Sequence, residues 1–310
     1  MTGDTTSLRA LADAQGGVVL TAQALAGGWT RGRLGRFLAS DGWARIRGGA
    51  WLAPGREAGP GELLWAHQLL RPEFVVSHWS AAALHGVEGG PPARPEFVCA
   101  ARAAVKGVRL HRLPLEPGEV TAVGGLRATT VARTMADLLR AGPRDEALLA
   151  VDSALAWRHV AAPGARGARR PPLTTLDAIG RALTSAPALR GARGAAWWLA
   201  LADPRAGSPA ETLARLRMHD AGLHPETQAV LVVPATGRRV YPDFLFRRQG
   251  LVVETEGYAW HGSRAQHQRD VIRFNALAAC PEVRRILRFT TADVRDRPAL
   301  MIRDIRAALA

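Results

Sequence analysis

Lysine, cysteine and long apolar runs are nearly absent from this sequence of 310 residues. Its two cysteines, Cys99 and Cys280, are too few for a disulfide framework, which excludes the class of small secreted domains held together by disulfides. No apolar run approaches the roughly 18 residues of a membrane-spanning helix, and no signal peptide opens the chain. We therefore expect a cytoplasmic protein without a membrane partner.

Arginine supplies almost all of the positive charge. Lys106 is the only lysine among 41 basic residues, and the formal net charge is +14. An excess of this size favours a polyanionic partner such as nucleic acid. The abundance of arginine, alanine and glycine is also typical of a GC-rich genome, so charge alone does not establish the partner. The hydrophobic content of 47% is ample for the cores of two or three domains.

The stretch from residue 241 to 261 carries the clearest candidate chemistry. Residues 240–246 and 251–256 have the composition of two strands, and a turn closed by glycine separates them. Because side chains alternate along a strand, Glu254 and Glu256 share one face of the second strand. Two carboxylates are therefore expected to point the same way.

A hairpin of these two strands brings a third acid close. Asp243 of the first strand then approaches Glu254 of the second, so that Asp243, Glu254 and Glu256 converge at one end of the sheet. Three carboxylates repel one another unless a cation lies among them, and oxygen ligands of this kind suit Mg²⁺. The sequence therefore predicts a metal site here. The alternative is a solvated turn, since acidic residues followed by glycine often occur at strand ends.

These acids belong to a series of short motifs that occur in a fixed order along the chain. They are Pro242-Asp243, Glu254-Thr255-Glu256, Gly257, His261, Arg269-Asp270, Arg273 and the strand 285–290. This order, over about the last third of the chain, resembles the very-short-patch-repair (Vsr-like) branch of the PD-(D/E)XK endonucleases. The resemblance implies a restriction-endonuclease-like α/β core in residues 207–310. It also implies that Asp243 and Glu254 hold Mg²⁺ or Mn²⁺, which activates a water molecule.

Three further residues are candidates for catalytic roles by this resemblance. Glu256 stands where the superfamily has a lysine, so the strand offers no cation of its own. His261 matches a histidine of Vsr-like enzymes and is the expected acid–base group, the alternative being a structural role in the turn. Glu211 ends the sequence Ser208-Pro209-Ala210-Glu211, which is typical of a capping box, while the superfamily also places a glutamate near the metal on this helix. Both roles of Glu211 stay open.

The first 58 residues predict a winged helix-turn-helix domain. Three short helices, starting near Ser7, Thr21 and Thr30, are followed by two strands. The pattern of Gly42, Trp43, Arg45 and Gly49 resembles the N-terminal domain of AbiEi-type antitoxins. The alternative is a three-helix interaction module with a solvated basic face.

Arginines mark the surfaces that we expect to contact double-stranded DNA. They are Arg31, Arg33 and Arg36 on the third helix, Arg45 and Arg47 in the wing, and Arg269 and Arg273 on a helix over residues 264–279.

Residues 59–160 are expected to form a mixed α/β domain, and residues 161–206 a linker followed by helices. The segment 77–82 resembles the region that follows the winged helix in AbiEi-like proteins, as does 133–138. No catalytic constellation occurs in this region, and three of its histidines are spaced unlike metal ligands, so we expect capping or core roles for them. These histidines are His78, His85 and His111.

The sequence thus predicts an α/β (α+β) protein and leaves two functional classes. The first is a Mg²⁺-dependent DNA endonuclease that a winged helix directs to DNA. The second is an antitoxin-like or transcriptional DNA-binding protein with a degenerate nuclease fold and a toxin–antitoxin or defence-system partner. Retention of Asp243, Glu254 and His261 favours the enzyme, because a decayed site is expected to have lost one of them.

Overall fold

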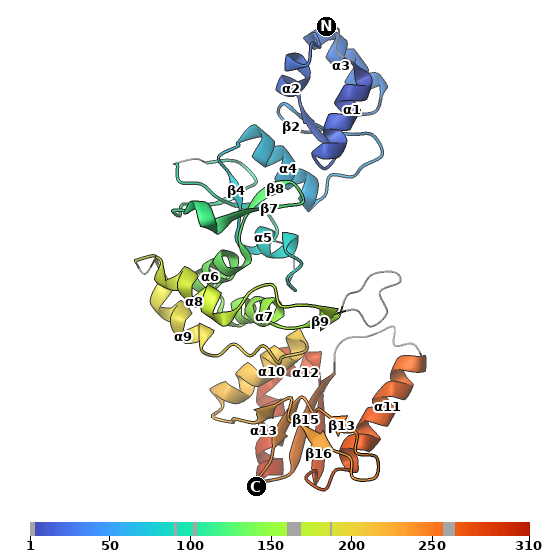
Figure 1. Cartoon of the computed structure of the whole chain (residues 1–310), viewed down its shortest axis with the longest axis vertical. Coiled ribbons are helices and arrows are strands. Elements are labelled where there is room, and N and C mark those ends of the chain that lie inside the picture. The colour runs from blue at the N-terminus through green and yellow to red at the C-terminus, as the bar shows by residue number, and fades with distance from the viewer. Residues whose placement is uncertain (1–3, 90–91, 102–103, 160–168, 187, 257–263) are drawn as a thin grey trace. The chain divides into compact units, whose positions relative to one another are not determined.

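The protein, seen in a computed structural model, is described over residues 4–89, 92–101, 104–159, 169–186, 188–256 and 264–310 (Figure 1). These residues form helices and several sheets, which agrees with the mixed α/β class predicted from the sequence. The chain divides into two compact units, residues 1–138 and 139–310. Within the described residues, no helix is long and apolar enough to cross a membrane.

The first unit opens with three helices and a small antiparallel sheet in residues 4–52. The elements are α1 (Thr5–Ala14), β1 (Val18–Leu20), α2 (Thr21–Ala26), α3 (Arg31–Ser40), β2 (Ala44–Arg47) and β3 (Ala50–Leu52), with strand order β1-β3-β2. Helix α1 begins earlier than predicted because Asp4 caps it, accepting the N–H groups of Thr6 and Ser7. Thr30 caps α3 as predicted. Apolar residues of all three helices and of β1 form one core.

A five-stranded sheet follows in the first unit. Its strands are β4 (Val75–Val76), β5 (Glu96–Val98), β6 (Arg109–His111), β7 (Val120–Val123) and β8 (Leu126–Thr129), in the order β6-β5-β4-β8-β7. The helices of this region are α4 (Pro60–Leu70), α5 (His78–Leu84), the 3-10 turn η1 (Pro117–Glu119) and α6 (Val131–Ala141). Helix α4 packs Ala66 against β1 and β3, and Leu64 against Phe74 and Phe97. It therefore contributes to the cores on both sides of the boundary predicted at residue 58.

The three histidines whose spacing was considered above have packing and capping roles. The rings of His78 and His111 stack with centroids 3.4 Å apart, and His78 is 3% exposed. His85 is the last, capping residue of α5, and its Nε2 lies 2.8 Å from the carbonyl oxygen of Thr129. These contacts agree with the structural roles expected from the spacing.

A four-stranded sheet lies at the centre of the C-terminal part of the second unit. Its strands, in spatial order, are β11 (Glu226–Thr227), β14 (Phe244–Phe246), β15 (Leu251–Glu256) and β16 (Arg285–Thr290), and β12 (Leu231–Val232) pairs separately with β13 (Arg239–Val240). Strands β14 and β15 form the antiparallel hairpin that the sequence predicts, whereas β15 and β16 are parallel. Parallel neighbours need a crossover, and helix α11 (Arg264–Ala278) lies within it.

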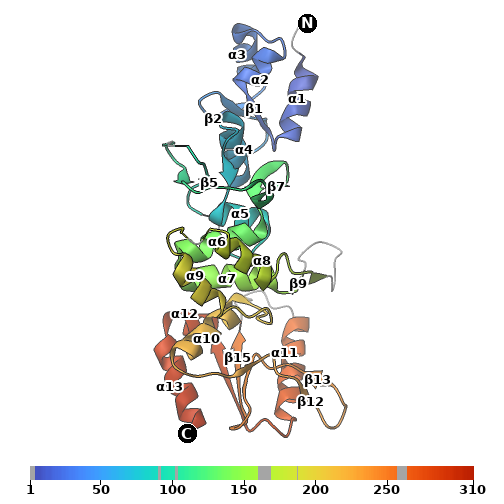
Figure 2. The same cartoon turned by 60° about the vertical axis from the view of Figure 1, so that its left-hand side comes forward.

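Helices cover both faces of this sheet (Figures 1 and 2). On one face, Leu251 and Val253 pack with α10 (Pro209–Asp220), α12 (Thr291–Asp296) and α13 (Pro298–Leu309). On the other face, Val252 packs with apolar residues of α11, β12 and β13. Alternation along β15 therefore directs Glu254 to the face that α11 covers.

A buried ionic network ties α10 to the helices before it. The preceding elements of the second unit are α7 (Arg144–Leu155), β9 (Arg158–His159), β10 (Arg169–Arg170), α8 (Leu176–Thr184) and α9 (Ala192–Leu199). Asp152 of α7 is fully buried and accepts hydrogen bonds from the Asp203 N–H (2.8 Å), Thr212 Oγ1 (2.9 Å) and Arg215 Nη2 (2.7 Å). Burial raises the pKa of Asp152, and the charge of Arg215 opposes this change.

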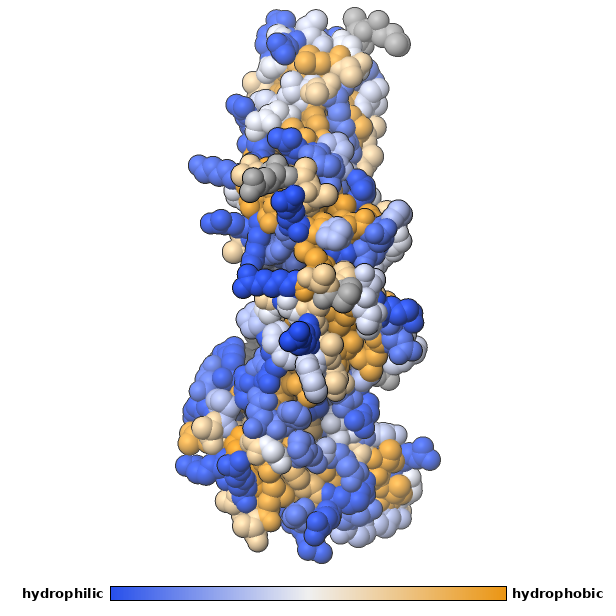
Figure 3. All heavy atoms as spheres, turned by 90° about the vertical axis from the view of Figure 1, so that its left-hand side faces the viewer, coloured by the Kyte–Doolittle hydropathy of each residue, from blue (hydrophilic) through white to orange (hydrophobic). Residues whose placement is uncertain are grey.

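The face drawn in Figure 3 is mixed in polarity. Hydrophobic residues gather there in several separate patches among hydrophilic ones. Roughly half or more of a folded protein's surface is apolar, so scattered patches need no partner to explain them. The hydropathy of this face therefore does not identify a binding surface. The candidate sites are instead identified by their ionisable side chains.

Removal of the Asp152 carboxylate should destabilise the second unit strongly. Asp152→Ala leaves the guanidinium of Arg215 and two further donors without their acceptor, a loss of about 3 to 5 kcal/mol. Asp220→Ala is the matched control, because it removes a carboxylate that pairs with Arg144 and is 41% exposed; the expected loss is below about 1 kcal/mol. Urea unfolding checks both values, and equal losses would contradict the network's importance.

Candidate functional site

The β14–β15 hairpin places Asp243 beside Glu254. Phe244 pairs with Val253 in the hairpin register, so the residue before Phe244 lies opposite Glu254. The Asp243 N–H donates a hydrogen bond of 2.9 Å to Glu254 Oε1. Asp243 is 3% exposed and Glu254 is 1% exposed. The two acids therefore form a buried pair rather than a solvated turn.

Arg273 of α11 joins these two carboxylates. Its Nη2 lies 2.9 Å from Asp243 Oδ1 and 2.9 Å from Glu254 Oε2, and it donates to the Tyr241 carbonyl oxygen at 3.1 Å. Although burial opposes its charge, Glu254 and Asp243 raise the pKa of Arg273. The sequence predicts that Arg273 contacts a phosphate. In the structure Arg273 forms ion pairs with the two acids instead, because Glu254 faces α11.

Glu211 of α10 is a third buried carboxylate near this pair. It is 8% exposed, and its Oε2 accepts the Gly207 N–H (2.8 Å) and Gln228 Nε2 (3.0 Å). Ser208 Oγ accepts the Glu211 N–H at 3.2 Å, which is the cap predicted for this helix. Burial raises the pKa of Glu211, and so does the charge of Asp243. The capping contact and the nearness to Asp243 are thus both present.

Glu254 holds its proton more tightly than an ordinary glutamate. Burial is the larger cause and the charge of Asp243 the next; together they raise the pKa of Glu254 to about 8, although Arg273 opposes them. A raised pKa of this origin means that the cluster favours an additional proton or cation. A divalent metal ion would meet the same electrostatic need.

The donor set fits a hard cation with few protein ligands. Across the described parts of the chain, no group of three or more His, Cys, Asp and Glu side chains is placed to hold a metal ion. Asp243 and Glu254 nevertheless offer oxygens to one shared cation, the guanidinium of Arg273. Mg²⁺ commonly uses one or two carboxylates and keeps several waters, so the pair is sufficient for it.

Glu256 does not join the buried pair. Its side chain is 43% exposed and forms an ion pair with Arg288 of β16, whose guanidinium lies 3.7 Å from the centroid of the Phe274 ring. The parallel neighbour β16 supplies this partner, and strand alternation alone does not reveal it. Of the other candidates, His261 and the side chain of Arg269 lie outside the described residues.

Two residues that the sequence did not single out hold Asp243 in place. Thr255 donates to Asp243 Oδ2 through its N–H (2.8 Å) and its Oγ1 (3.0 Å). Gln228, in a left-handed conformation with φ 52°, donates its N–H to the Asp243 carbonyl oxygen at 3.0 Å and its side chain to Glu211. A strained backbone of this kind persists where the surroundings fix it, often at functional sites. The motif around Thr255 hints at its role, but no local signal marks Gln228.

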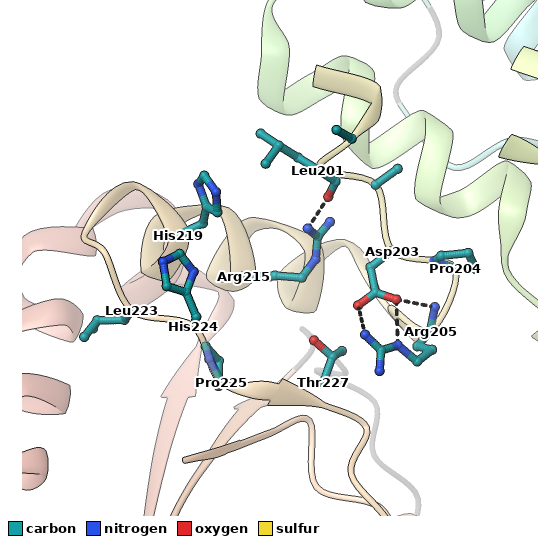
Figure 4. Close-up of a pocket in the computed structure, with 12 residues that line it drawn as sticks. Leu201, Asp203, Pro204, Arg205, Arg215, His219, Leu223, His224, Pro225 and Thr227 are labelled. Atoms are coloured by element: carbon teal, nitrogen blue, oxygen red, sulfur yellow. Dashed lines mark hydrogen bonds and ion pairs between the residues drawn. The ribbon is translucent and has the colours of Figure 1, made fainter. Parts of the chain in front are cut away.

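A pocket of about 480 Å³ lies against the C-terminal half of α10 (Figure 4). Two arginines line it, and both bind acceptors: Arg205 pairs with Asp203 at 2.9 Å, and Arg215 pairs with Asp152. His219 and His224 also line it, with their ring centroids 5.4 Å apart in an edge-to-face arrangement. Because its arginines are already neutralised, the pocket shows less distinctive chemistry than the buried carboxylates.

Helix α3 presents the arginines predicted to contact DNA. Arg31, Arg33 and Arg36 are all exposed, while Leu34 and Leu38 of the same helix are buried. The guanidinium of Arg33 lies 4.8 Å from the centroid of the Trp29 ring. The helix therefore has an apolar face toward the core and a basic face toward solvent.

The two arginines of the β2–β3 hairpin differ from each other. A bulge between them shifts the register, so that Arg45 is exposed and Arg47 is half-buried. Arg47 Nη1 lies 2.9 Å from His67 Nε2, and its Nη2 donates to the Lys106 carbonyl oxygen at 3.2 Å. Burial, aided by the charge of Arg47, lowers the pKa of His67 to about 4. Arg47 thus links the hairpin to α4, whereas Arg45 is exposed to solvent.

Comparison with known proteins adds little. No family model matches the sequence, and no curated protein matches it. Among solved structures, the crystal structure of the RV2827C protein from Mycobacterium tuberculosis is similar with a TM-score of 0.41 and 16% sequence identity, over 74% of this chain and 89% of that chain. A likeness at this level carries no inference about function.

Glu254 predicts a pH dependence of stability in the metal-free protein. Its folded-state pKa of about 8 lies above the ordinary 4.5. Its contribution to stability is therefore complete below pH 4.5 and is lost as the pH rises through about 8. Glu254→Gln keeps an oxygen for the Asp243 N–H but cannot ionise. In thermal unfolding with EDTA, the wild type should lose stability relative to this variant across that interval, and parallel curves would contradict the assignment.

Proposed function

We propose that this protein is a Mg²⁺-dependent DNA endonuclease, hydrolysing phosphodiester bonds, with a winged helix-turn-helix that directs it to double-stranded DNA. The observation that carries the proposal is the buried pair of Asp243 and Glu254, which share one cation at the end of a hairpin. Buried paired acids are costly to maintain, and sites of this kind are often functional.

The arrangement around the pair supports a restriction-endonuclease-like core. The sheet joins an antiparallel hairpin to a parallel strand through a helical crossover, with helices on both faces. The order of acids, basic helix and final strand resembles the Vsr-like branch of the PD-(D/E)XK nucleases. The sheet, the pair and the motif order together favour this assignment over a chance match.

The proposal assigns a separate role to each residue of the site. Asp243 and Glu254 would hold Mg²⁺ or Mn²⁺, and the bound metal would polarise the phosphate and activate water. Thr255 keeps the carboxylate of Asp243 oriented through two hydrogen bonds. Glu211 places a third carboxyl group beside Asp243, and its burial and the charge of Asp243 raise the pKa of Glu211. His261 is proposed, from the resemblance, as the acid–base group.

The N-terminal elements support the targeting role. Three short helices are followed by the β2–β3 hairpin, and the third helix exposes three arginines. A recognition helix beside a hairpin is the arrangement of winged helix-turn-helix domains. The resemblance to AbiEi-type antitoxins adds a toxin–antitoxin or defence-system setting to this proposal.

Asp243→Asn should abolish cleavage while duplex binding is retained. The change removes one negative metal ligand but keeps the size of the side chain, so the DNA-binding surface is unaltered. Plasmid nicking with Mg²⁺ or Mn²⁺, compared with Ca²⁺ or EDTA, measures the loss. The matched control is Asp304→Asn, which changes an exposed aspartate paired with Arg303 and should cut normally. Equal cleavage by the two variants would overturn the assignment of Asp243.

Replacement of Arg31, Arg33 and Arg36 by glutamine should weaken duplex binding and its salt dependence. Removal of one phosphate-binding arginine lowers the slope of log K against log salt by about one. Replacement of Arg71, Arg94 and Arg112 is the matched control, since it removes the same charge from exposed positions of the same unit. Fluorescence anisotropy over a salt series compares them. An identical slope for the two triple variants would leave α3 as a solvated face.

A second candidate function rests on one observation. Arg273 already serves as a counter-ion for both acids, so the carboxylates are buried with a cation from the chain itself. This favours an antitoxin-like or transcriptional DNA-binding protein with a degenerate nuclease fold. Such a protein would bind DNA through α3 equally well in EDTA, and would show neither cleavage nor Mn²⁺ binding that depends on Asp243.

A further inference from the structure

The cation of the carboxylate site is supplied by a helix outside the hairpin. Arg273 is in the middle of α11, whereas Asp243 and Glu254 belong to the β14–β15 hairpin. A single guanidinium nitrogen, Nη2, contacts Asp243 Oδ1, both carboxylate oxygens of Glu254 and the Tyr241 carbonyl oxygen. One guanidinium therefore forms ion pairs with both acids at the same time.

The same space cannot hold a second cation. The second oxygen of Asp243 accepts two hydrogen bonds from Thr255, and the second oxygen of Glu254 accepts the Asp243 N–H. A metal ion shared by the two acids would therefore use the oxygens that Arg273 Nη2 contacts at 2.9 Å. Two cations so close together repel each other strongly in a partly buried site, where screening by water is weak. The guanidinium must therefore move before a metal ion can bind both carboxylates.

Arg273 is able to move away. Its side chain is 39% exposed, although the acids beneath it are almost completely buried. A long arginine side chain can keep its stem packed while its charged head turns toward water. The five N–H donors of a released guanidinium match a phosphate group, which is the partner that the sequence predicts for Arg273.

We propose that Arg273 and a divalent metal ion exclude each other from the Asp243–Glu254 pair. Arg273 is the counter-ion of the metal-free site, it weakens metal binding, and the incoming metal releases its guanidinium from the acids. This inference rests on the proposed function, because it assigns the pair as metal ligands. It adds that the chain contains its own competitor for the metal.

Titration of the full-length protein with Mn²⁺, followed by electron paramagnetic resonance of the free ion, tests the exclusion without any activity. Arg273→Gln should bind Mn²⁺ about tenfold more tightly than the wild type, which corresponds to about 1.4 kcal/mol for the displaced ion pair. Arg288→Gln is the matched control, because the guanidinium of Arg288 forms its ion pair with Glu256 at the same end of the sheet and not with the buried acids. Its affinity should equal that of the wild type.

Thermal unfolding gives a second readout. In EDTA, Arg273→Gln should melt below the wild type, because two buried acids have lost their counter-ion, and Mn²⁺ should raise its melting temperature more than that of the wild type. If this variant folds only when Mn²⁺ is present, the same exclusion is demonstrated. Arg273→Lys, which keeps the charge without the planar fork, should show an intermediate affinity.

The outcomes separate this inference from the function on which it rests. Equal or weaker Mn²⁺ binding by Arg273→Gln, with binding in both proteins abolished by Asp243→Asn, overturns the exclusion and leaves the metal site standing. Mn²⁺ binding that is absent, or that Asp243→Asn does not alter, overturns the proposed metal site itself. A tenfold gain that also appears in Arg288→Gln reflects net charge alone and overturns the exclusion.

Discussion

Two carboxylates buried side by side are the constraint on which the C-terminal part of this protein depends. Removal of an ionised carboxylate from water costs several kcal/mol, and the repulsion between two of them adds to that cost. For Asp243 and Glu254, this cost is offset by hydrogen bonds from N–H groups of the hairpin and by the guanidinium of Arg273. The raised pKa of Glu254 shows that the compensation is incomplete. The pair therefore favours a proton, or a cation of higher charge than the single guanidinium.

The topology of the sheet delivers these groups to one place. The apolar run of β15 is buried on both faces and ends at Glu254, so this carboxylate lies where the packed core meets the end of the sheet. The crossover to the parallel strand β16 brings α11, and with it Arg273, over the same face. Strand β16 itself brings Arg288 to Glu256. The buried pair and Glu256 thus take their arginines from two different elements, α11 and β16.

The parts of the site that depend on neighbouring positions could be predicted from the sequence. Alternation and a glycine turn were enough to place Asp243 beside Glu254, because both residues belong to one hairpin. The nearness of Glu211 to Asp243 could be suggested only by resemblance, since packing of α10 against the sheet brings it there. In the β2–β3 hairpin, a one-residue bulge gives Arg45 and Arg47 different surroundings. No alternation pattern reveals such a bulge, because it is set by the partner strand.

Under the proposed function, the origin of the site's cation would separate this protein from nucleases that carry a lysine on the second strand. A lysine on the second strand would move with the metal ligands and would always stand at the same distance from them. Here Glu256 occupies that position, and the positive charge comes from Arg273 on α11. A guanidinium has several donors in one plane and can release one acceptor while it gains another. Transfer of Arg273 from the carboxylates to a phosphate would therefore need rotation of one side chain, with no change in the sheet.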